Sequence, residues 1–296
     1  MPINHELLAA ARTAFRAVLG TDDLPKEKRP WERLALLTKS TGASEEYAFG
    51  EDLGGMEEWI DDRTATQLRV QKFTILNKDF QKAIRVHKND IADDRLGMYA
   101  SKLKNMKRAQ AAHYWKLIID LLLGGFAAGA KAYDGKAFFA TTHAFGSNKG
   151  TGVLSATNFD TAMQKLYEMA EDAPDGEDAE PLDVVSDSQP ILVCGPSNRA
   201  TARKLLKIAN LGSDGDNPNF EEADLIVTGR ITGAKWFVLL DGLPIKPLLL
   251  QLRSETQPDW VTEPGKEKPT GMFGFDARYN AGYALPQLAY GSSAGE

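Results

Sequence analysis

The chain has 296 residues, of which 43% are hydrophobic and 26% are charged, and its formal net charge is −6. These proportions are typical of a globular protein with a substantial core, in one large domain or two connected ones. An acidic chain is a poor candidate for tight nucleic-acid binding, because neutralising phosphates needs clustered Lys and Arg.

Cysteine content and hydropathy exclude further classes of protein. The single cysteine, Cys194, rules out an intramolecular disulfide and a zinc site of the CxxC type, and it favours folding in the cytosol. The N-terminus has no cationic segment followed by an apolar stretch, so we expect no signal peptide. The longest apolar stretch, residues 117–130, contains Asp120 and three glycines and is too short and interrupted to span a bilayer.

The first part of the chain predicts an arm, over residues 1–39. Apolar residues recur at helical spacing in residues 1–20, and Asn4 and Gly20 suit the two ends of a helix. Residues 21–33 are polar and contain two prolines. Because a short isolated helix is marginal in water, its apolar stripe needs a partner. The main members of this stripe are Leu7, Leu8, Phe15 and Leu19.

Residues 40–62 predict a long exposed loop or hairpin. They are rich in Gly, Ser and acidic residues and contain three aromatic residues, Tyr47, Phe49 and Trp59. Exposed aromatic side chains are typical of an interface, but the three rings could equally fold back on the core. Short alternations of apolar residues in the stretch 68–86 predict strands, with a turn or bulge between them.

Residues 96–122 predict a helix of roughly 40 Å, which is longer than most globular helices. Asp93 or Asp94 suits the N-terminal cap, and Gly124 with Gly125 suits the end. Residues of one predicted face recur at steps of three or four: Leu96, Tyr99, Leu103, Met106, Gln110, His113, Leu117 and Leu121.

The remaining residues predict a mixture of short helices and strands. Asp134 and Gly135 predict a hairpin turn between residues 132–133 and 138–139. The mixed order indicates an α+β fold. The other predicted elements are helices at 158–169 and after 198, strands at 189–194, 224–228, 235–240 and 245–252, an extended loop at 253–270, and an alternating tail at 273–290.

No pattern of catalytic or metal-binding residues outweighs a simpler interpretation. Cys194 and His143 could act as nucleophile and base, but Cys194 lies in an apolar run, which is typical of a buried inert thiol. The four histidines are scattered and lack ligand spacing. Residues 214–222 resemble a calcium loop, but Pro218 occupies a ligand position. There is no phosphate-binding loop or nucleophile elbow, so we predict no enzyme, no cofactor and no metal.

Two segments rich in aromatic and small residues resemble a known family. Residues 273–291 read FGFDARYNAGYALPQLAYG, and residues 133–143 read YDGKAFFATTH. They resemble the C-terminal stretch, and a segment after the long helix, of the major head (capsid) subunit of Mu-like tailed phages. Further similar segments follow in the same order over nearly the whole chain, among them Trp59 with Asp62 and Arg63, FTILNK at 73–78, IADD at 91–94, and ILVCGP at 191–196.

The resemblance implies an α+β, Hong Kong 97-like phage capsid fold. This fold has an N-terminal arm, an extended E-loop, a peripheral domain with a long spine helix, and an axial domain. The corresponding expected ranges are 1–39 for the arm, 40–86 for the E-loop region, 87–182 for the peripheral domain, 183–243 for the axial domain, and 244–296 for the return to the peripheral domain with closing C-terminal strands.

The implied function is assembly: the subunits would form hexamers and pentamers of an icosahedral head that encloses phage DNA. Partners would be copies of this chain, a separate scaffold protein, a portal protein, DNA bound without sequence specificity, and decoration proteins as an open option. The protein would assemble in the host cytoplasm and reside in the virion, with no membrane partner and no covalent crosslink. Expected inter-subunit contacts are Leu7, Leu8, Phe15, Leu19, Tyr47, Phe49 and Trp59.

Two other functions stay open from the residues alone. One is a soluble α+β enzyme of unrecognised type, and the other is a tail or baseplate interaction protein. A fold-level analogy does not decide between them. The missing active site and the arm without an internal partner favour the shell subunit.

Overall fold

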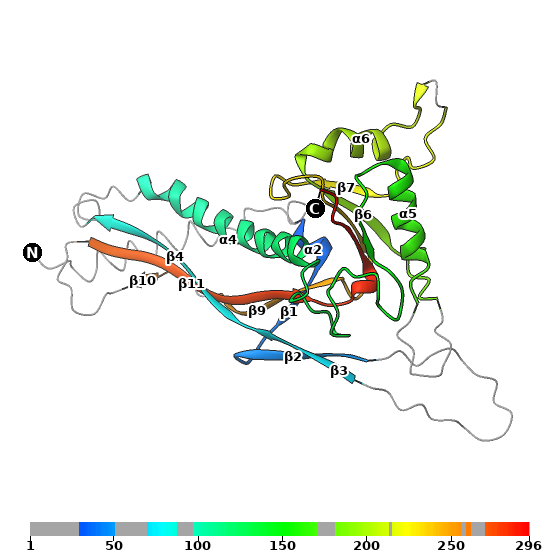
Figure 1. Cartoon of the computed structure of the whole chain (residues 1–296). Coiled ribbons are helices and arrows are strands. Elements are labelled where there is room, and N and C mark those ends of the chain that lie inside the picture. Colours follow the sequence, from blue (N-terminus) through cyan, green and yellow to red (C-terminus); the bar gives the residue numbers. More distant parts are fainter. Residues whose placement is uncertain are drawn as a thin grey trace, which may run out of the picture.

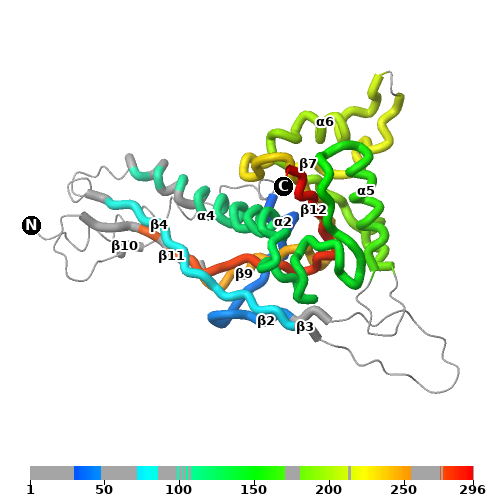
Figure 2. The backbone as a smooth tube through the Cα atoms, in the orientation of Figure 1, coloured from blue at the N-terminus to red at the C-terminus, as the bar shows by residue number. Residues whose placement is uncertain are grey.

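The structure is a computed structural model that describes residues 30–50, 70–87, 97–170, 181–212, 215–255, 259–261 and 270–295. Within these residues, a long helix packs against two five-stranded sheets, and a two-stranded sheet covers the far side of the first of them (Figures 1 and 2). Helices and strands are mixed along the chain, which confirms the predicted α+β class.

The first sheet joins strands that lie far apart in the sequence. Its order is β1–β9–β11–β10, and β4 also pairs with β11. The pairing of β1 with β9 is parallel, and the other pairings are antiparallel. The strands are β1 (Ala35–Lys39), β4 (Lys78–His87), β9 (Leu248–Glu255), β10 (Asp259–Val261) and β11 (Thr270–Tyr283).

Both faces of the first sheet are covered where β9 crosses it. Helix α4 (Gly97–Gly124) packs on one face, where Ile118 and Leu250 share a buried core. Strands β2 (Ser44–Gly50) and β3 (Val70–Leu76) pack on the other face, where Ile75 contacts Leu249 and Ala284. Successive side chains of a strand point to opposite faces, so Leu249 and Leu250 face the β2–β3 hairpin and α4 respectively.

The second sheet has the order β5–β12–β8–β6–β7 and is buried on both faces. Val193 and Phe237 face the core shared with α4, whereas Cys194 and Trp236 face α5 and α6. Burial on both faces explains why β6 and β8 are continuous apolar runs in the sequence. The elements are α5 (Ala156–Tyr167), α6 (Arg199–Lys207), β5 (Lys149–Gly150), β6 (Gln189–Cys194), β7 (Asp224–Val227), β8 (Trp236–Asp241) and β12 (Ala289–Ser292).

Side-chain hydrogen bonds stabilise the ends of α5 and α6, and three short helices complete the described fold. Ser155 caps α5, since its side chain accepts the backbone N–H of Asn158 at 3.2 Å. Asn217 donates to the carbonyl of Leu205 near the end of α6, at 2.7 Å. The short helices are α2 (Trp31–Leu34), η2 (Pro196–Asn198) and η4 (Pro286–Leu288).

Several parts of the predicted ranges lie in the sheets. At the end of the predicted arm, residues 1–39, Trp31 and Leu34 are buried in the main core and β1 belongs to the first sheet. Likewise β4, inside the predicted E-loop region 40–86, is a full strand of that sheet. The predicted loop 253–270 contains a short strand, β10. The C-terminal region 244–296 contributes strands to both large sheets.

The turn at Asp134 and Gly135 is present without the predicted hairpin strands. Gly135 has a φ of +76°, and its N–H donates to the carbonyl of Ala132 at 3.1 Å. The flanking residues form a single bridge, between Lys131 and Ala137. The aromatic residues that follow the turn, Phe138 and Phe139, are buried in the main core.

Candidate assembly surfaces

A polar network around Gln251 fixes the β2–β3 hairpin to the first sheet. Gln251 lies on β9 and is fully buried. Its Nε2 donates to Asn77 Oδ1 at 2.8 Å, and its Oε1 accepts the hydroxyl of Tyr47 at 3.0 Å. The Tyr47 hydroxyl also shares a hydrogen bond of 2.8 Å with Thr38 of β1. Since a buried polar group is costly unless it is paired, this network favours one orientation of the hairpin.

The turn that precedes β2 is closed by Glu45. Its Oε1 accepts the backbone N–H groups of Gly42 at 2.9 Å and Thr41 at 2.6 Å, and the hydroxyl of Ser40 at 3.0 Å. These bonds, led by the N–H of Gly42, lower the pKa of Glu45. Asn77 Nδ2 donates to Ser40 Oγ at 2.8 Å and to the Gly42 carbonyl at 3.0 Å. The two ends of the β2–β3 segment are therefore connected at one point.

Tyr47 is the one predicted contact residue whose side chain lies in the described residues. It is half-buried and packs on the ring of Phe73, with ring centroids 5.7 Å apart. Tyr47 therefore folds back on its own subunit, and an inter-subunit contact of this residue stays a prediction. Phe49 lies on β2, but its side chain is outside the described residues. The other predicted contacts, Leu7, Leu8, Phe15, Leu19 and Trp59, also lie outside them.

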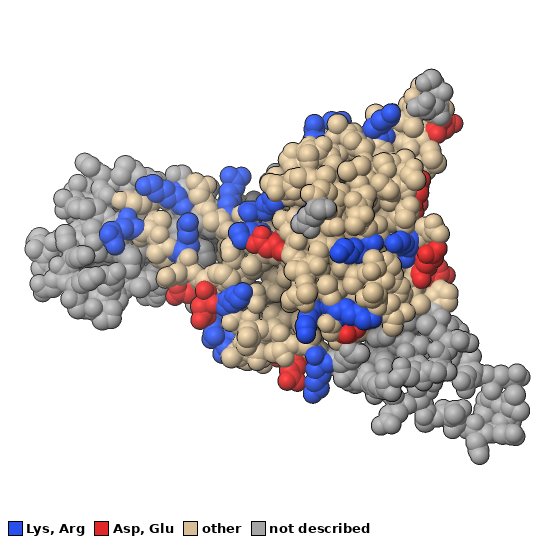
Figure 3. Space-filling view, in the orientation of Figure 1, with Lys and Arg blue, Asp and Glu red and all other residues tan. Residues whose placement is uncertain are grey.

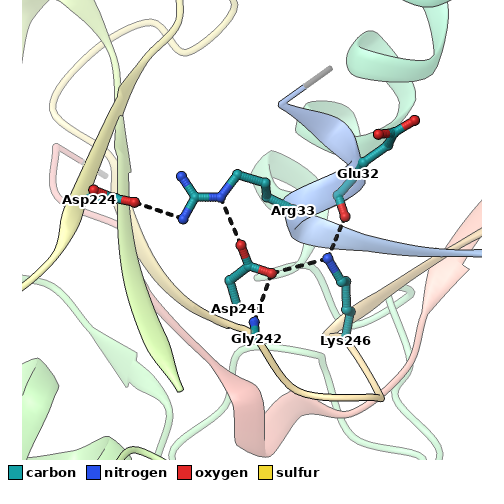
Figure 4. Close-up of polar contacts among 6 residues, drawn as sticks. All are labelled: Glu32, Arg33, Asp224, Asp241, Gly242 and Lys246. Carbon is teal, nitrogen blue, oxygen red and sulfur yellow. Dashed lines mark hydrogen bonds and ion pairs between the residues drawn. The ribbon is translucent and has the colours of Figure 1, made fainter. Parts of the chain in front are cut away.

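A second polar cluster connects α2 to the second sheet (Figure 4). Arg33 donates from Nε to Asp241 Oδ2 at 2.7 Å and from Nη2 to Asp224 Oδ2 at 2.8 Å. Lys246 donates to Asp241 Oδ1 at 3.1 Å and to the carbonyl of Glu32. The cluster thus fixes the segment that follows residues 1–29 against β7 and β8.

The charges of this cluster support one another. Burial alone would raise the pKa of Asp241, but hydrogen bonds from Arg33, the Gly242 N–H and Lys246 hold this pKa below its usual value. Burial likewise opposes the charge of Arg33, yet its two carboxylate partners raise the pKa of the guanidinium. Because the folded-state pKa of Asp241 is lowered, its contribution to stability is lost as the pH falls through that pKa.

Replacing Arg33 by Gln is expected to destabilise the subunit by about 1–2 kcal/mol, after allowing for partial solvent screening. The loss should shrink as the pH falls from about 4 through the lowered pKa of Asp241, because the protonated acid no longer attracts the guanidinium. Thermal unfolding over a pH series measures this. The matched control is Lys72→Gln, which removes an exposed ion pair with Glu46 and should change stability little. Equal losses in both variants would contradict a role of the cluster.

The structure does not bring the predicted catalytic candidates into a reactive arrangement. His143 Nδ1 lies 2.6 Å from Asp134 Oδ2, and its ring stacks on Phe145 at 4.6 Å between centroids. Within the described residues, His143 Nε2 has no hydrogen-bond partner. Cys194 is buried in the core beside α5 and α6. The same residues include no group of three or more His, Cys, Asp or Glu that could hold a metal ion.

Cys194 is expected to be unreactive in the folded protein. Burial raises the pKa of its thiol to about 11, and the thiolate is the reactive form. Native protein should therefore resist alkylation by iodoacetamide at neutral pH, whereas protein denatured in guanidinium should be labelled completely. Mass spectrometry of the two samples measures the difference. Rapid labelling of the native sample would show that the second sheet opens.

The two segments that suggested a family contact each other. Gln287 Nε2 donates to the hydroxyl of Tyr133 at 2.6 Å. Asn148 is fully buried, and its Nδ2 donates to the carbonyls of Phe138 at 2.8 Å and Pro286 at 3.0 Å. The two segments therefore meet at a buried junction that stabilises the subunit.

A long helix packed against both large sheets, a fixed hairpin on the far face of the first sheet, and helices on the other face of the second sheet make up the Hong Kong 97-like capsid fold. Two solved structures share this fold. The procapsid of bacteriophage JBD30 has a TM-score of 0.58 and 23% identity, and the match covers 98% of this chain and 76% of that chain. The capsid of cyanophage P-SCSP1u has a TM-score of 0.60 and 8% identity, and the match covers 90% of this chain and 88% of that chain. The chain belongs to the family of the Mu-like prophage major head subunit gpT, whose model matches residues 6–154 and 228–295.

Two curated relatives are similar to the chain in sequence. The Mu-like prophage FluMu major head subunit of Haemophilus influenzae is 25% identical over 274 residues, which cover 91% of this chain and 68% of that protein. The major capsid protein of Escherichia phage Mu is 31% identical over 160 residues, which cover 54% of this chain and 50% of that protein.

Family membership confirms the predicted fold and the structural role. The chain is a major capsid subunit that assembles with copies of itself, and it is not an enzyme. It is a component of the virion. None of the helices in the described ranges has the length and apolar content that crossing a bilayer requires.

Proposed function

We propose that the subunits associate as hexamers and pentamers that close an icosahedral head around phage DNA. The observation that supports this most directly is the Gln251 network, which holds the β2–β3 hairpin in one orientation on the sheet. The strands of that hairpin precede and follow residues 51–69, which contain six acidic residues and Trp59. A fixed base would present this segment to a neighbouring subunit at a defined angle, as closed symmetric assembly requires.

Each part of the subunit would have a separate role in assembly. Residues 1–29 would form the arm, and α2 with the Arg33 cluster would set the direction in which the arm leaves. Residues 40–76 would form the E-loop region. The first sheet with α4 would be the peripheral domain, and the second sheet with α5 and α6 would be the axial domain. Their different covering helices support this division, because α5 and α6 cover the face of the second sheet that points away from α4.

Further partners of the shell would act at defined stages. A separate scaffold protein would direct curvature during assembly in the host cytoplasm, and a portal protein would occupy one vertex. The related JBD30 capsid is decorated with minor capsid protein trimers, and a decoration protein is proposed for this shell as well. Packaged DNA would be held without sequence recognition, in keeping with the net charge of −6.

Negative-stain imaging of the purified protein, together with light scattering, tests the proposed assembly. Closed shells, tubes or ring-shaped capsomers support it. Particles that stay monomeric at high concentration, even with a scaffold protein supplied, would contradict it.

A further inference from the structure

The exposed side of α4 forms a line of positive charge. In an α-helix, residues three or four positions apart share a face, and each described exposed side chain of α4 fits this spacing. Arg230 adds a further cation to this face, because its Nη2 donates to the carbonyl of Ala112 at 3.1 Å. We call Lys102, Arg108, Lys116 and Arg230 the cationic ridge. The exposed face consists of Lys102, Asn105, Arg108, Ala112, Lys116 and Asp120.

The cationic ridge continues onto the sheet beside it. On β4, Phe80 stacks on Tyr279 and lies 4.5 Å from the ring of His113 on α4, measured between centroids. Alternation along the strand puts Lys78 and Lys82 on the same side as Phe80, and both are exposed. Figure 3 shows Lys and Arg side chains gathered over α4 and β4.

Among the residues that the structure describes, little negative charge offsets the ridge. Asp120 is the only acidic residue in the sequence of α4, and its pair with Lys116 is half exposed, so it is weak. The pKa of His113 is lowered, first by burial and then by Lys116 and Arg230, although Asp120 opposes them. The described charged side chains on the exposed face of this helix are therefore mostly positive.

On the opposite face of the first sheet, the described charged residues are balanced in sign. Asp79 forms an ion pair with Arg278, and Asp276 and Arg85 are exposed nearby on the paired strands. The positive charge is thus a property of one side of the sheet. The chain has a net charge of −6. Its overall composition therefore does not explain why positive charge gathers on one side of this sheet.

Among the described residues, the ridge has none of the large apolar side chains that anchor protein partners. Protein interfaces depend on a few large apolar or aromatic residues. The large hydrophobic side chains that are exposed among the described residues all lie outside α4 and β4. A row of cations without such residues suits a phosphate backbone, which is bound mainly by charge and without base recognition.

We propose that the cationic ridge is the surface through which the shell wall contacts the phosphates of packaged double-stranded DNA. This inference rests on the proposed function and assigns DNA to one side of the subunit. From Lys102 to Lys116 the ridge spans roughly 21 Å at 1.5 Å per residue. So short a row of cations neutralises only a few phosphates, which gives weak, salt-sensitive contact that still lets DNA leave the head.

The test compares two double variants that remove the same charge. K102Q/R108Q changes the ridge, and K72Q/R85Q changes exposed cations of β3 and of the opposite face of β4. Binding of purified full-length protein to a double-stranded DNA fragment is measured by fluorescence anisotropy over a salt series, and circular dichroism checks folding. Each phosphate contact contributes about 0.9 to the magnitude of the negative slope of log binding constant against log salt concentration. This magnitude should decrease by about 2 in the ridge variant and stay unchanged in the control.

Three results would overturn the proposal. The first is that the wild type does not bind DNA at low salt, and the second is that the two double variants show equal salt slopes for DNA binding. The third is that the ridge variant loses binding to polyglutamate but keeps binding to DNA. The last result would assign the ridge to an acidic protein instead. Imaging of the same preparations separates this inference from the proposed function. Wild-type protein that binds DNA as expected but forms no shells would contradict assembly and not the ridge.

Discussion

Replacing Ile118 by Asp is expected to leave the subunit unfolded or insoluble. Ile118 is fully buried in the core that α4 shares with both large sheets. An uncompensated buried charge costs roughly 3–5 kcal/mol, which is a large share of the roughly 5–15 kcal/mol that stabilise a typical protein. Circular dichroism and the soluble fraction after expression measure the effect.

The matched control for Ile118→Asp is Asn105→Asp on the exposed face of the same helix. It adds the same charge to a solvated position, so the subunit should fold normally. A folded Ile118→Asp subunit would show that α4 is not the centre of the core. Failure of both variants would indicate that α4 tolerates no added acid, whatever its burial.

Replacing Trp59 by Ala is expected to leave a folded, soluble subunit that assembles poorly. Trp59 lies outside the described residues, and its role is inferred from its place in the acidic stretch after β2. Loss of an interface aromatic costs about 2 kcal/mol or more, and every subunit of a shell repeats the contact. Sedimentation velocity with circular dichroism separates assembly from folding.

Trp59→Phe is the control for this prediction, since it retains an aromatic ring and should assemble nearly as well as the wild type. If Trp59→Ala unfolds the subunit, Trp59 is a core residue and the interpretation of residues 40–62 as an assembly loop is wrong. If it assembles normally, the contact is made by other residues of the loop.

The length of α4 could be predicted from sequence, but its buried face could not. Gly124 and Gly125 marked its end, and the predicted range 96–122 agrees with the observed Gly97–Gly124. The predicted stripe included Leu117 and Leu121, which are half-buried, whereas Ile118 and Leu122 one position further on are fully buried. Residues 115–123 are apolar apart from Lys116 and Asp120. Such an apolar run does not indicate which face of the helix packs against the two sheets.

The polar networks depend on contacts that no local pattern predicts. Gln251 and Asn77 are 174 residues apart, and Arg33 and Asp241 are 208 apart. Gln251 did give a local signal, since it is the one polar residue in the apolar run at 248–252, and a lone polar residue in a buried strand indicates a hydrogen-bond network. Arg33 gave none, because it lies in a charged segment that predicted exposure.

The parallel pairing of β1 with β9 has a consequence for the rate of folding. Ala35 pairs with Leu248, so the first sheet cannot be completed until the chain has closed a very large loop. Folding slows as contacts become more distant in sequence. Strands that remain unpaired in a folding intermediate are prone to aggregation. We expect slow folding of newly made subunits to limit how fast assembly-competent subunits accumulate. A slow supply of that kind would keep the free concentration low and favour the growth of existing shells over the start of new ones.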